Sequence, residues 1–190
     1  MQVAIPHDDG LESWLPAAQR GDRRAAERVL RALLPRVRNL VRYLVRGDSH
    51  VDDMAQQALI AILRGLPSYQ GTGSFEAWAD RITVRETLRI AKKERARAQA
   101  RREAAPDLRV VRAEGARPDA YLERREAARL LDTLPAEQRE ALVLHHVLGM
   151  SVPEVAEALG VPFDTAKSRL RLAKKKLRAR AEAAQGGRGR

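Results

Sequence analysis

The sequence has 190 residues and contains no cysteine. This absence excludes disulfide bonds, cysteine-based zinc sites and thiol catalysis, and it fits a reducing compartment. Aromatic residues make up only 4% of the chain, which disfavours large stacking platforms for single-stranded bases. No apolar run approaches the roughly 18–20 residues of a membrane helix, and the N-terminal segment has no apolar run typical of a signal peptide. We therefore expect a cytoplasmic protein without membrane insertion.

Positive charge, in contrast, is abundant. The chain carries 36 Lys and Arg against 25 Asp and Glu, a formal net charge of +11 at pH 7. An excess of this size favours a polyanionic partner, with nucleic acid as the first candidate and an anionic membrane surface as the second. Hydrophobic residues make up 44% of the chain, so it can bury a core and is more than a basic tail.

Signals of catalysis are weak. The sequence shows no Ser-His-Asp arrangement, no phosphate-cradling glycine loop and no carboxylate cluster that would suggest a two-metal nuclease. The adjacent His145 and His146 point in different directions on a helix, which argues against a metal site. We expect no enzyme, no metal and no cofactor; a basic nuclease is an alternative class for which no residues can be named.

Helical periodicity dominates the chain, because apolar residues recur three and four apart and no segment alternates like a strand. This pattern predicts an all-α fold with two helical domains, at 1–103 and 119–184. Between them, residues 104–118 contain proline, glycine and no periodic apolar face, which indicates a flexible linker. We expect a disordered tail at 185–190.

Individual helices are bounded by caps and breakers. Asp22 and Ser74 are candidate N-caps, and Pro35 predicts a kink or break in the second helix. The expected helices cover residues 11–20, 22–46, 51–66, 75–102, 119–133, 136–148, 152–159 and 162–184.

The second domain carries the pattern of a helix-turn-helix. Ser151 is a candidate N-cap, Gly160 stands where a left-handed C-cap residue is needed, and Pro162 opens the next helix. One buried stripe is expected on that next helix, at Ala166, Leu170, Ala173 and Leu177. A short helix, a tight turn with glycine and a second amphipathic helix are typical of this DNA-binding motif.

The outer faces of this last helix are basic, and no acid interrupts the cations between Lys167 and Arg180. Like charges repel along a helix, and DNA phosphates would relieve that repulsion. Residues near the N-terminal end of such a helix usually reach base edges. A solvated charge face is the alternative interpretation. The residues that we expect to contact DNA are Thr165, Lys167, Ser168, Arg169, Arg171, Lys174 and Lys175.

Three stretches in the second domain carry a family resemblance: LPAEQREALVL from Leu134, GMSVPEVAEALGV from Gly149 and TAKSRLRLAK from Thr165. In this order and spacing they resemble region 4 of bacterial sigma-70 family factors, and they look like the extracytoplasmic-function (ECF) group. In the first domain, DMAQQALIAIL from Asp53 resembles region 2.2. FEAWADRITVR from Phe75, with the lysines that follow, resembles regions 2.3 and 2.4. The two blocks cover residues 13–103 and 119–181.

The resemblance implies a sigma factor that binds core RNA polymerase, directs it to promoter DNA through −35 and −10 elements, and assists promoter opening. It implies that the basic helix reads the −35 element. Polymerase contacts are implied for Asp52, Asp53, Gln56 and Gln57. Contacts with the −10 element and the melted strand are implied for Tyr69, Phe75, Trp78, Arg81, Arg85, Arg89, Lys92 and Lys93. It also implies an anti-sigma factor as a partner.

Several positions have a second interpretation or depart from the family pattern. The Asp52–Asp53 pair can simply favour the positive end of a helix dipole, and Trp78 can simply pack in the core. Arg85 stands where the group usually has an asparagine, and Leu172 where it often has an arginine, which predicts altered promoter preference. The alternative function is a helix-turn-helix regulator that binds a palindrome as a dimer without polymerase, which leaves the first domain unexplained.

Overall fold

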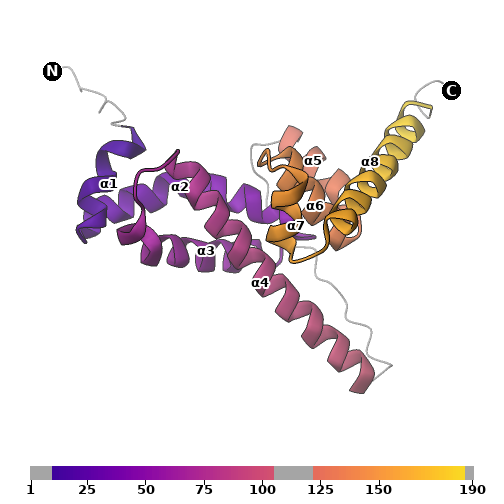
Figure 1. Cartoon of the computed structure of the whole chain (residues 1–190), viewed down its shortest axis with the longest axis horizontal. Coiled ribbons are helices and arrows are strands. Elements are labelled where there is room, and N and C mark those ends of the chain that lie inside the picture. Colours follow the sequence, from indigo (N-terminus) through magenta and orange to yellow (C-terminus); the bar gives the residue numbers. More distant parts are fainter. Residues whose placement is uncertain (1–9, 105–121, 187–190) are drawn as a thin grey trace.

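The computed structural model describes residues 10–104 and 122–186. Within these ranges the chain is all-α, as the sequence predicts, and contains no strand (Figure 1). The elements are α1 (Leu11–Gln19), α2 (Arg23–Leu44), α3 (Val51–Gly65), the short 3-10 helix η1 (Leu66–Ser68), α4 (Phe75–Ala104), α5 (Leu122–Asp132), α6 (Ala136–His146), α7 (Val152–Leu159) and α8 (Phe163–Gly186). The predicted linker lies outside the described residues except at Ala104, which ends α4, and the predicted tail begins inside α8.

Local signals place most helix ends where the sequence predicts them. The Asp22 carboxylate accepts a hydrogen bond from the Ala25 N–H at 3.0 Å, and the Ser74 hydroxyl accepts one from Ala77 at 3.1 Å. Each of these oxygens satisfies one unpaired donor of the first turn.

Of the kink or break predicted at Pro35, the break is wrong, because α2 runs unbroken from Arg23 to Leu44. Pro35 lies on the exposed face of α2, where the carbonyl that loses its helical partner can reach water. The flanking Leu33 and Val37 are 2% and 1% exposed, so core packing holds both halves of the helix in place.

The first four helices enclose one core, with α2 in contact with α1, α3 and α4 (Figure 1). A buried stripe of α2, at Val29, Leu33, Val37 and Val41, runs through this core. The opposite side is closed by Met54, Ala58 and Ile62 of α3. Burying such a stripe, rather than helix propensity, supplies most of the stability of a helix in a folded protein.

Helices α7 and α8 form the helix-turn-helix, and α6 packs against both. Gly160 has a φ of 62° and ends α7 in the left-handed conformation that only glycine adopts without strain. Of the predicted stripe on α8, Ala166, Leu170 and Ala173 are buried and Leu177 is partly buried. Helix α8 starts one residue later than predicted, because Pro162 is the N-cap: its carbonyl accepts from the Ala166 N–H at 3.1 Å.

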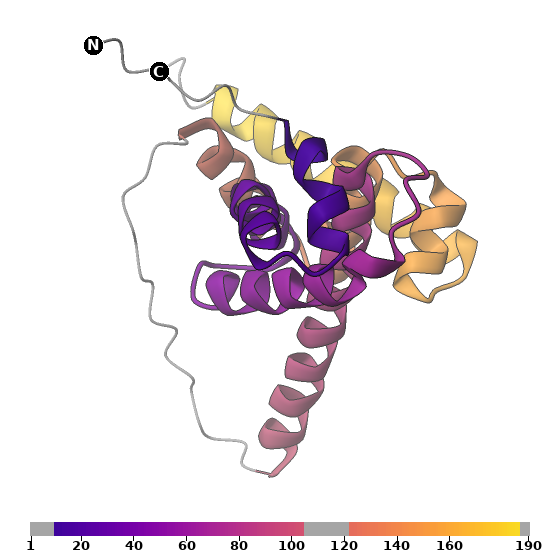
Figure 2. The ribbon, with the colours of Figure 1, turned by 90° about the vertical axis from the view of Figure 1, so that its left-hand side faces the viewer.

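The two halves are also in contact, which the sequence did not predict. The C-terminal end of α2 lies beside α5 and α6 (Figures 1 and 2). Leu40 and Leu44 of α2 and Val84 of α4 are buried in the same cluster as Leu134 and Leu142. The second core is therefore completed by side chains from the first half of the chain.

Candidate nucleic-acid interface

Helix α8 presents the predicted basic surface. Lys167, Arg171, Lys174 and Lys175 are exposed, because the buried stripe turns the other side of the helix toward α6 and α7. Thr165, Ser168 and Arg169 are half-buried near the N-terminal end of α8. The arrangement places cations along one side of α8 and short polar groups near its N-terminal end, the part that usually reaches base edges in helices of this motif.

Helix α7, the first helix of the motif, is fixed at its start by Ser151 and Glu154. The Glu154 carboxylate accepts hydrogen bonds from the Ser151 hydroxyl at 2.7 Å and from the Ser151 backbone N–H at 2.8 Å. The hydrogen bond from the Ser151 hydroxyl contributes most to holding the pKa of Glu154 below its ordinary value, and the one from the backbone N–H contributes next. Ser151 and Glu154 form the capping box of α7, which pairs backbone donors at the start of this helix and fixes where it begins.

Arg139 anchors the other side of the motif. Its side chain is 2% exposed, with Nε donating to the Leu131 carbonyl at 3.0 Å and Nη2 donating to the Leu134 carbonyl at 3.3 Å. Nη1 of Arg139 lies 3.7 Å from Oδ1 of Asp132. Burial lowers the pKa of Arg139 to about 10, which leaves it protonated at neutral pH. Arg139, on α6, therefore binds the carbonyls of Leu131 at the end of α5 and of Leu134 in the turn, and so joins α5 to α6.

This role of Arg139 was not among the predictions from the sequence. The sequence signal for it is a single arginine in α6, directly before Glu140 and next to the buried apolar run that begins at Ala141.

Helix α4 carries a second basic surface. Arg81, Arg85 and Arg89 are exposed at i, i+4 and i+8, so they share one face of the helix. Lys92 and Lys93 are exposed one turn further on. Arg89 is paired with Glu86 at 2.8 Å. The face can contact a phosphate backbone along several turns.

Three aromatic side chains gather at the start of α4. The ring centroids of Tyr69, Phe75 and Trp78 lie 5.2–5.3 Å apart, with Phe75 and Trp78 stacked. Tyr69 and Trp78 are half-buried, whereas Phe75 is 1% exposed. The predicted contact of Phe75 with DNA is therefore corrected: the Phe75 ring faces the core and supports the other two rings.

The segment around this cluster is tied to the rest of the fold. The Tyr69 hydroxyl donates to the Gly73 carbonyl at 2.9 Å, and Gln19 of α1 donates to the Tyr69 carbonyl at 2.7 Å. Gly65 leaves room for the Trp78 ring, since a Cβ there would lie 3.2 Å from Trp78 Cζ2. The rings are therefore held in place while the Gly71–Gly73 loop stays exposed.

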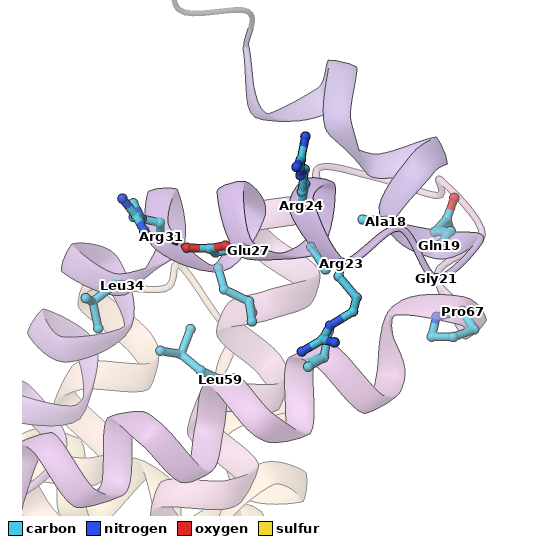
Figure 3. Close-up of a pocket in the computed structure, with 13 residues that line it drawn as sticks. Ala18, Gln19, Gly21, Arg23, Arg24, Glu27, Arg31, Leu34, Leu59 and Pro67 are labelled. Atoms are coloured by element: carbon cyan, nitrogen blue, oxygen red, sulfur yellow. Dashed lines mark hydrogen bonds and ion pairs between the residues drawn. The ribbon is translucent and has the colours of Figure 1, made fainter.

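A third surface lies on α3, where Asp52, Asp53, Gln56 and Gln57 are all exposed. Asp52 is paired with Arg38 of α2 at 2.8 Å. A groove of about 810 Å³ lies between α1, α2 and α3 and is lined on the α3 side by Leu59 and Leu63 (Figure 3). Apolar side chains of α2 and α3 form its floor: Leu30, Leu34, Leu59 and Leu63.

The two halves of the chain match two family models. "Sigma-70 region 2" matches residues 29–97, which span α2 to most of α4, and "Sigma-70, region 4" matches residues 124–177, which span α5 to α8. The chain belongs to the sigma-70 family. Its ECF character rests on two curated relatives. The chain is 33% identical over 182 residues to the ECF RNA polymerase sigma factor SigE of Mycolicibacterium smegmatis. It is 29% identical over 167 residues to the ECF RNA polymerase sigma-E factor of Escherichia coli K12.

These alignments cover 93% and 80% of this sigma-70 chain, and it spans 66% and 84% of the two relatives. Two solved structures share the fold of this sigma-70 chain. CnrH, in complex with the cytosolic domain of CnrY, has a TM-score of 0.52 at 24% identity over 90% of this chain and 96% of CnrH. The Bartonella quintana sigma factor RpoE, in complex with the anti-sigma factor NepR, has a TM-score of 0.57 at 23% identity over 80% and 94%.

In family terms, α2 from Val29, α3 and most of α4 belong to region 2, and α5–α8 to region 4. No helix in the described part of the chain is long and apolar enough to cross a membrane.

Proposed function

We propose that this chain is an ECF-type sigma factor: a non-enzymatic subunit that binds core RNA polymerase, directs it to −35 and −10 promoter elements and assists promoter opening in the cytoplasm. The observation that carries this proposal is the joining, in one chain, of a region 2 with an exposed basic helix and a region 4 with an exposed basic recognition helix. A stand-alone helix-turn-helix regulator would need only the basic helix of region 4, and the second basic helix, in region 2, would have no role in it.

For the −35 element we assign α8. Lys167 and Arg169 lie near its N-terminal end and would donate to guanine O6 and N7 in the major groove, with Thr165 and Ser168 beside them. Arg171, Lys174 and Lys175 would contact phosphates further along the helix. Leu172 is 40% exposed and offers an apolar contact at a position where an arginine is frequent in the group.

For the −10 element we assign α4 and the aromatic cluster. Tyr69 and Trp78 present ring edges and faces next to an exposed loop, where an unstacked base can be received. Arg81, Arg85 and Arg89 would contact the phosphates on either side of that base. Arg85 cannot reproduce the hydrogen bonds of an asparagine amide, so we propose a −10 preference that departs from the usual one.

For core polymerase we assign the outer face of α3. Asp53 and Gln56 are exposed on this helix, and Leu59 and Leu63 further along it line the groove of Figure 3. A mixed surface of carboxylates, amides, the exposed Leu63 and the half-buried Leu59 is suited to a protein partner rather than to DNA, because carboxylates repel phosphates. Asp52 and Gln57 flank the same surface.

We also propose regulation by an anti-sigma factor. RpoE of Bartonella quintana was solved with the anti-sigma factor NepR, and that structure shares the fold of this chain.

An electrophoretic mobility shift with a library of genomic fragments tests the function. We expect a sequence-selective complex only when the chain and core polymerase are both present. The matched variants are D53A/Q56A on α3, expected to abolish the joint complex, and the exposed E12A on α1, expected to leave it unchanged. A selective shift of a palindrome by the chain alone, unaffected by polymerase, would instead establish the stand-alone regulator.

A further inference from the structure

The first turn of α8 presents two exposed side chains ahead of the basic surface of this helix. Phe163, the first residue of α8, is 48% exposed, and the Asp164 carboxylate next to it is exposed as well. The DNA contacts predicted from the sequence begin one residue later, at Thr165. In a helix-turn-helix, residues at the N-terminal end of the second helix meet the base edges, so both side chains are placed to take part.

Asp164 lies on the side of α8 that faces away from the core. It is followed at i+4, i+7 and i+11 by Ser168, Arg171 and Lys175, so the four residues share one face. The buried stripe that includes Ala166 occupies the other side of the helix. Within the part of the chain that the structure describes, the Asp164 carboxylate has neither an ion pair nor a hydrogen-bond partner.

A free carboxylate on this face opposes the binding of DNA in general. The cations of α8 attract phosphates and Asp164 repels them, so the acid lowers the affinity for any DNA that offers it no hydrogen-bond donor. A second interpretation is that Asp164 only favours the positive end of the helix dipole, as acids in a first turn do. An acid on any side of the first turn would fill that role, whereas Asp164 lies on the face that carries the DNA contacts.

The major groove offers few donors to a carboxylate. Guanine presents O6 and N7 and thymine presents O4, and these acceptors repel an acid. Adenine presents its N6 amino group beside the N7 acceptor. Cytosine presents its N4 amino group with no acceptor on the same base edge, and it is the base that acids contact. Asp164 therefore selects for cytosine and against the other three bases.

Phe163 supplies an apolar group beside this acceptor. Its ring opens α8 directly after Pro162 and is half exposed, outside the buried cluster of the second core. The apolar group that base edges present in the major groove is the C5-methyl of thymine, and phenylalanine is one of the side chains that contact it. The first turn thus offers an acceptor and an apolar ring to neighbouring bases. We call Phe163 and Asp164 the α8 tip.

We propose that the α8 tip determines specificity for the −35 element: Asp164 accepts a hydrogen bond from N4 of a cytosine, and Phe163 packs on the methyl group of a thymine. This inference rests on the proposed function, which assigns α8 to the −35 element. The cations of α8 supply affinity for DNA of any sequence. Asp164 withholds part of that affinity from sequences that lack the cytosine.

Base exchange tests the role of Asp164. Polymerase holoenzyme with the full chain is measured by fluorescence anisotropy on duplexes that carry each of the four base pairs at every position of the preferred −35 element. The parent should prefer cytosine at one position by about five- to twentyfold. D164A should lose this preference. D164N should transfer it to adenine, because an asparagine amide pairs with N6 and N7 of that base.

E126Q on α5 is the matched control, since it removes one negative charge from an exposed helical position of the same half of the chain and leaves α8 intact. It should keep the preference for cytosine. Thermal unfolding is followed for each variant. A D164N protein with lowered stability and an unchanged base preference would show that Asp164 acts on the helix dipole alone, and it would overturn the proposal.

Deoxyuridine tests the role of Phe163. It lacks the methyl group of thymine and keeps its hydrogen-bonding groups, so replacing one thymine at a time removes only the apolar contact. The parent should lose about two- to fivefold in affinity at one thymine, and F163A should bind the two duplexes equally. A parent protein that binds every thymine duplex and its deoxyuridine counterpart equally would overturn the assignment of Phe163.

Two outcomes separate the α8 tip from the proposed function. If the holoenzyme forms and initiates transcripts while D164N and the parent prefer the same bases, the tip is overturned and the sigma factor stands. If the chain binds no core polymerase but selects a duplex with cytosine on its own, and D164N exchanges that cytosine for adenine, the tip stands and the sigma factor is overturned.

Discussion

Arg36 of α2 holds Asp80 of α4 through two parallel hydrogen bonds, from Nε to Oδ1 at 2.8 Å and from Nη2 to Oδ2 at 2.6 Å. The Asp80 side chain is 7% exposed, and the hydrogen bond from Arg36 to Asp80 raises the pKa of the arginine. The pair positions the start of α4, and with it Trp78 and Arg81. We expect R36A to lower the free energy of unfolding by about 1–3 kcal/mol, because the buried carboxylate loses its partner.

Urea denaturation followed by circular dichroism measures this loss. The control is R31A, which breaks the exposed Arg31–Glu27 pair on the same helix and should cost less than about 0.5 kcal/mol. R36A/D80N should recover part of the stability, since a neutral amide tolerates burial better than a carboxylate. Equal losses for R31A and R36A would show that the pair does not hold α2 to α4.

The close approach of Gly65 to Trp78 gives a second prediction. In G65A the new Cβ would lie 3.2 Å from Trp78 Cζ2, and the ring is backed by Phe75 and Tyr69 at 5.3 Å, so it has little room to move. Overpacking costs about 1–3 kcal/mol, whereas the better helix propensity of alanine returns less than about 1 kcal/mol.

The net effect expected for G65A is therefore a destabilisation of about 1 kcal/mol, with a changed fluorescence of Trp78 in a W14F background. G10A, where a Cβ meets nothing within 4 Å, is the control; Gly10 is the N-cap of α1, so we expect a loss of roughly a few tenths of a kcal/mol and an unchanged fluorescence of Trp78. A stabilised G65A with parental fluorescence would mean that the ring is not held against α3.

The Ser151–Glu154 capping box predicts a pH dependence. Hydrogen bonds from Ser151 lower the pKa of Glu154, so the folded state favours the charged carboxylate. Its contribution is complete above the ordinary glutamate pKa of about 4.3 and is lost as the pH falls through the lower folded value. The difference in unfolding free energy between the parent and E154Q should therefore shrink from pH 6 to pH 3. A difference that stays constant over this range would show that Glu154 is not coupled to Ser151.

Two substitutions on α8 should separate sequence reading from phosphate contact. R169A, near the N-terminal end of the helix, should weaken binding to the preferred −35 sequence by about 1–3 kcal/mol and relax the preference at one base pair. K175A should weaken binding to all sequences alike and reduce the salt slope by about one. The measurement is fluorescence anisotropy of polymerase holoenzyme on −35 variants at several salt concentrations. Identical effects of the two variants on every sequence would contradict the assignment of Arg169 to base reading.

What the sequence predicted well depends on local chain geometry. The caps at Asp22, Ser74 and Ser151, and the left-handed turn at Gly160, follow from residues within four positions of one another. The buried stripe of α8 follows from helical periodicity in the same way. The exposure of the cations on α4 and α8 follows too, because the apolar residues of each helix turn toward the core and leave the basic face outward.

The contacts that the sequence did not predict join distant residues. Arg36 and Asp80 are 44 residues apart, and Arg42 and Asp132 are 90 apart. A charged residue that pairs with a distant residue carries no periodic signal. In the sequence it cannot be distinguished from an arginine or aspartate that is exposed to solvent. Phe75 was misassigned for a related reason: its position in a family motif does not say which way its ring points.

Run-off transcription with purified core polymerase over a genomic fragment library tests the proposed function most directly. We expect discrete start sites that require the full chain and share spaced upstream elements. We also expect D53A/Q56A to lose all of these transcripts and K175A to reduce all of them together. An unchanged transcript pattern with and without the chain, together with a failure of the chain to bind core polymerase, would contradict the assignment of a sigma factor.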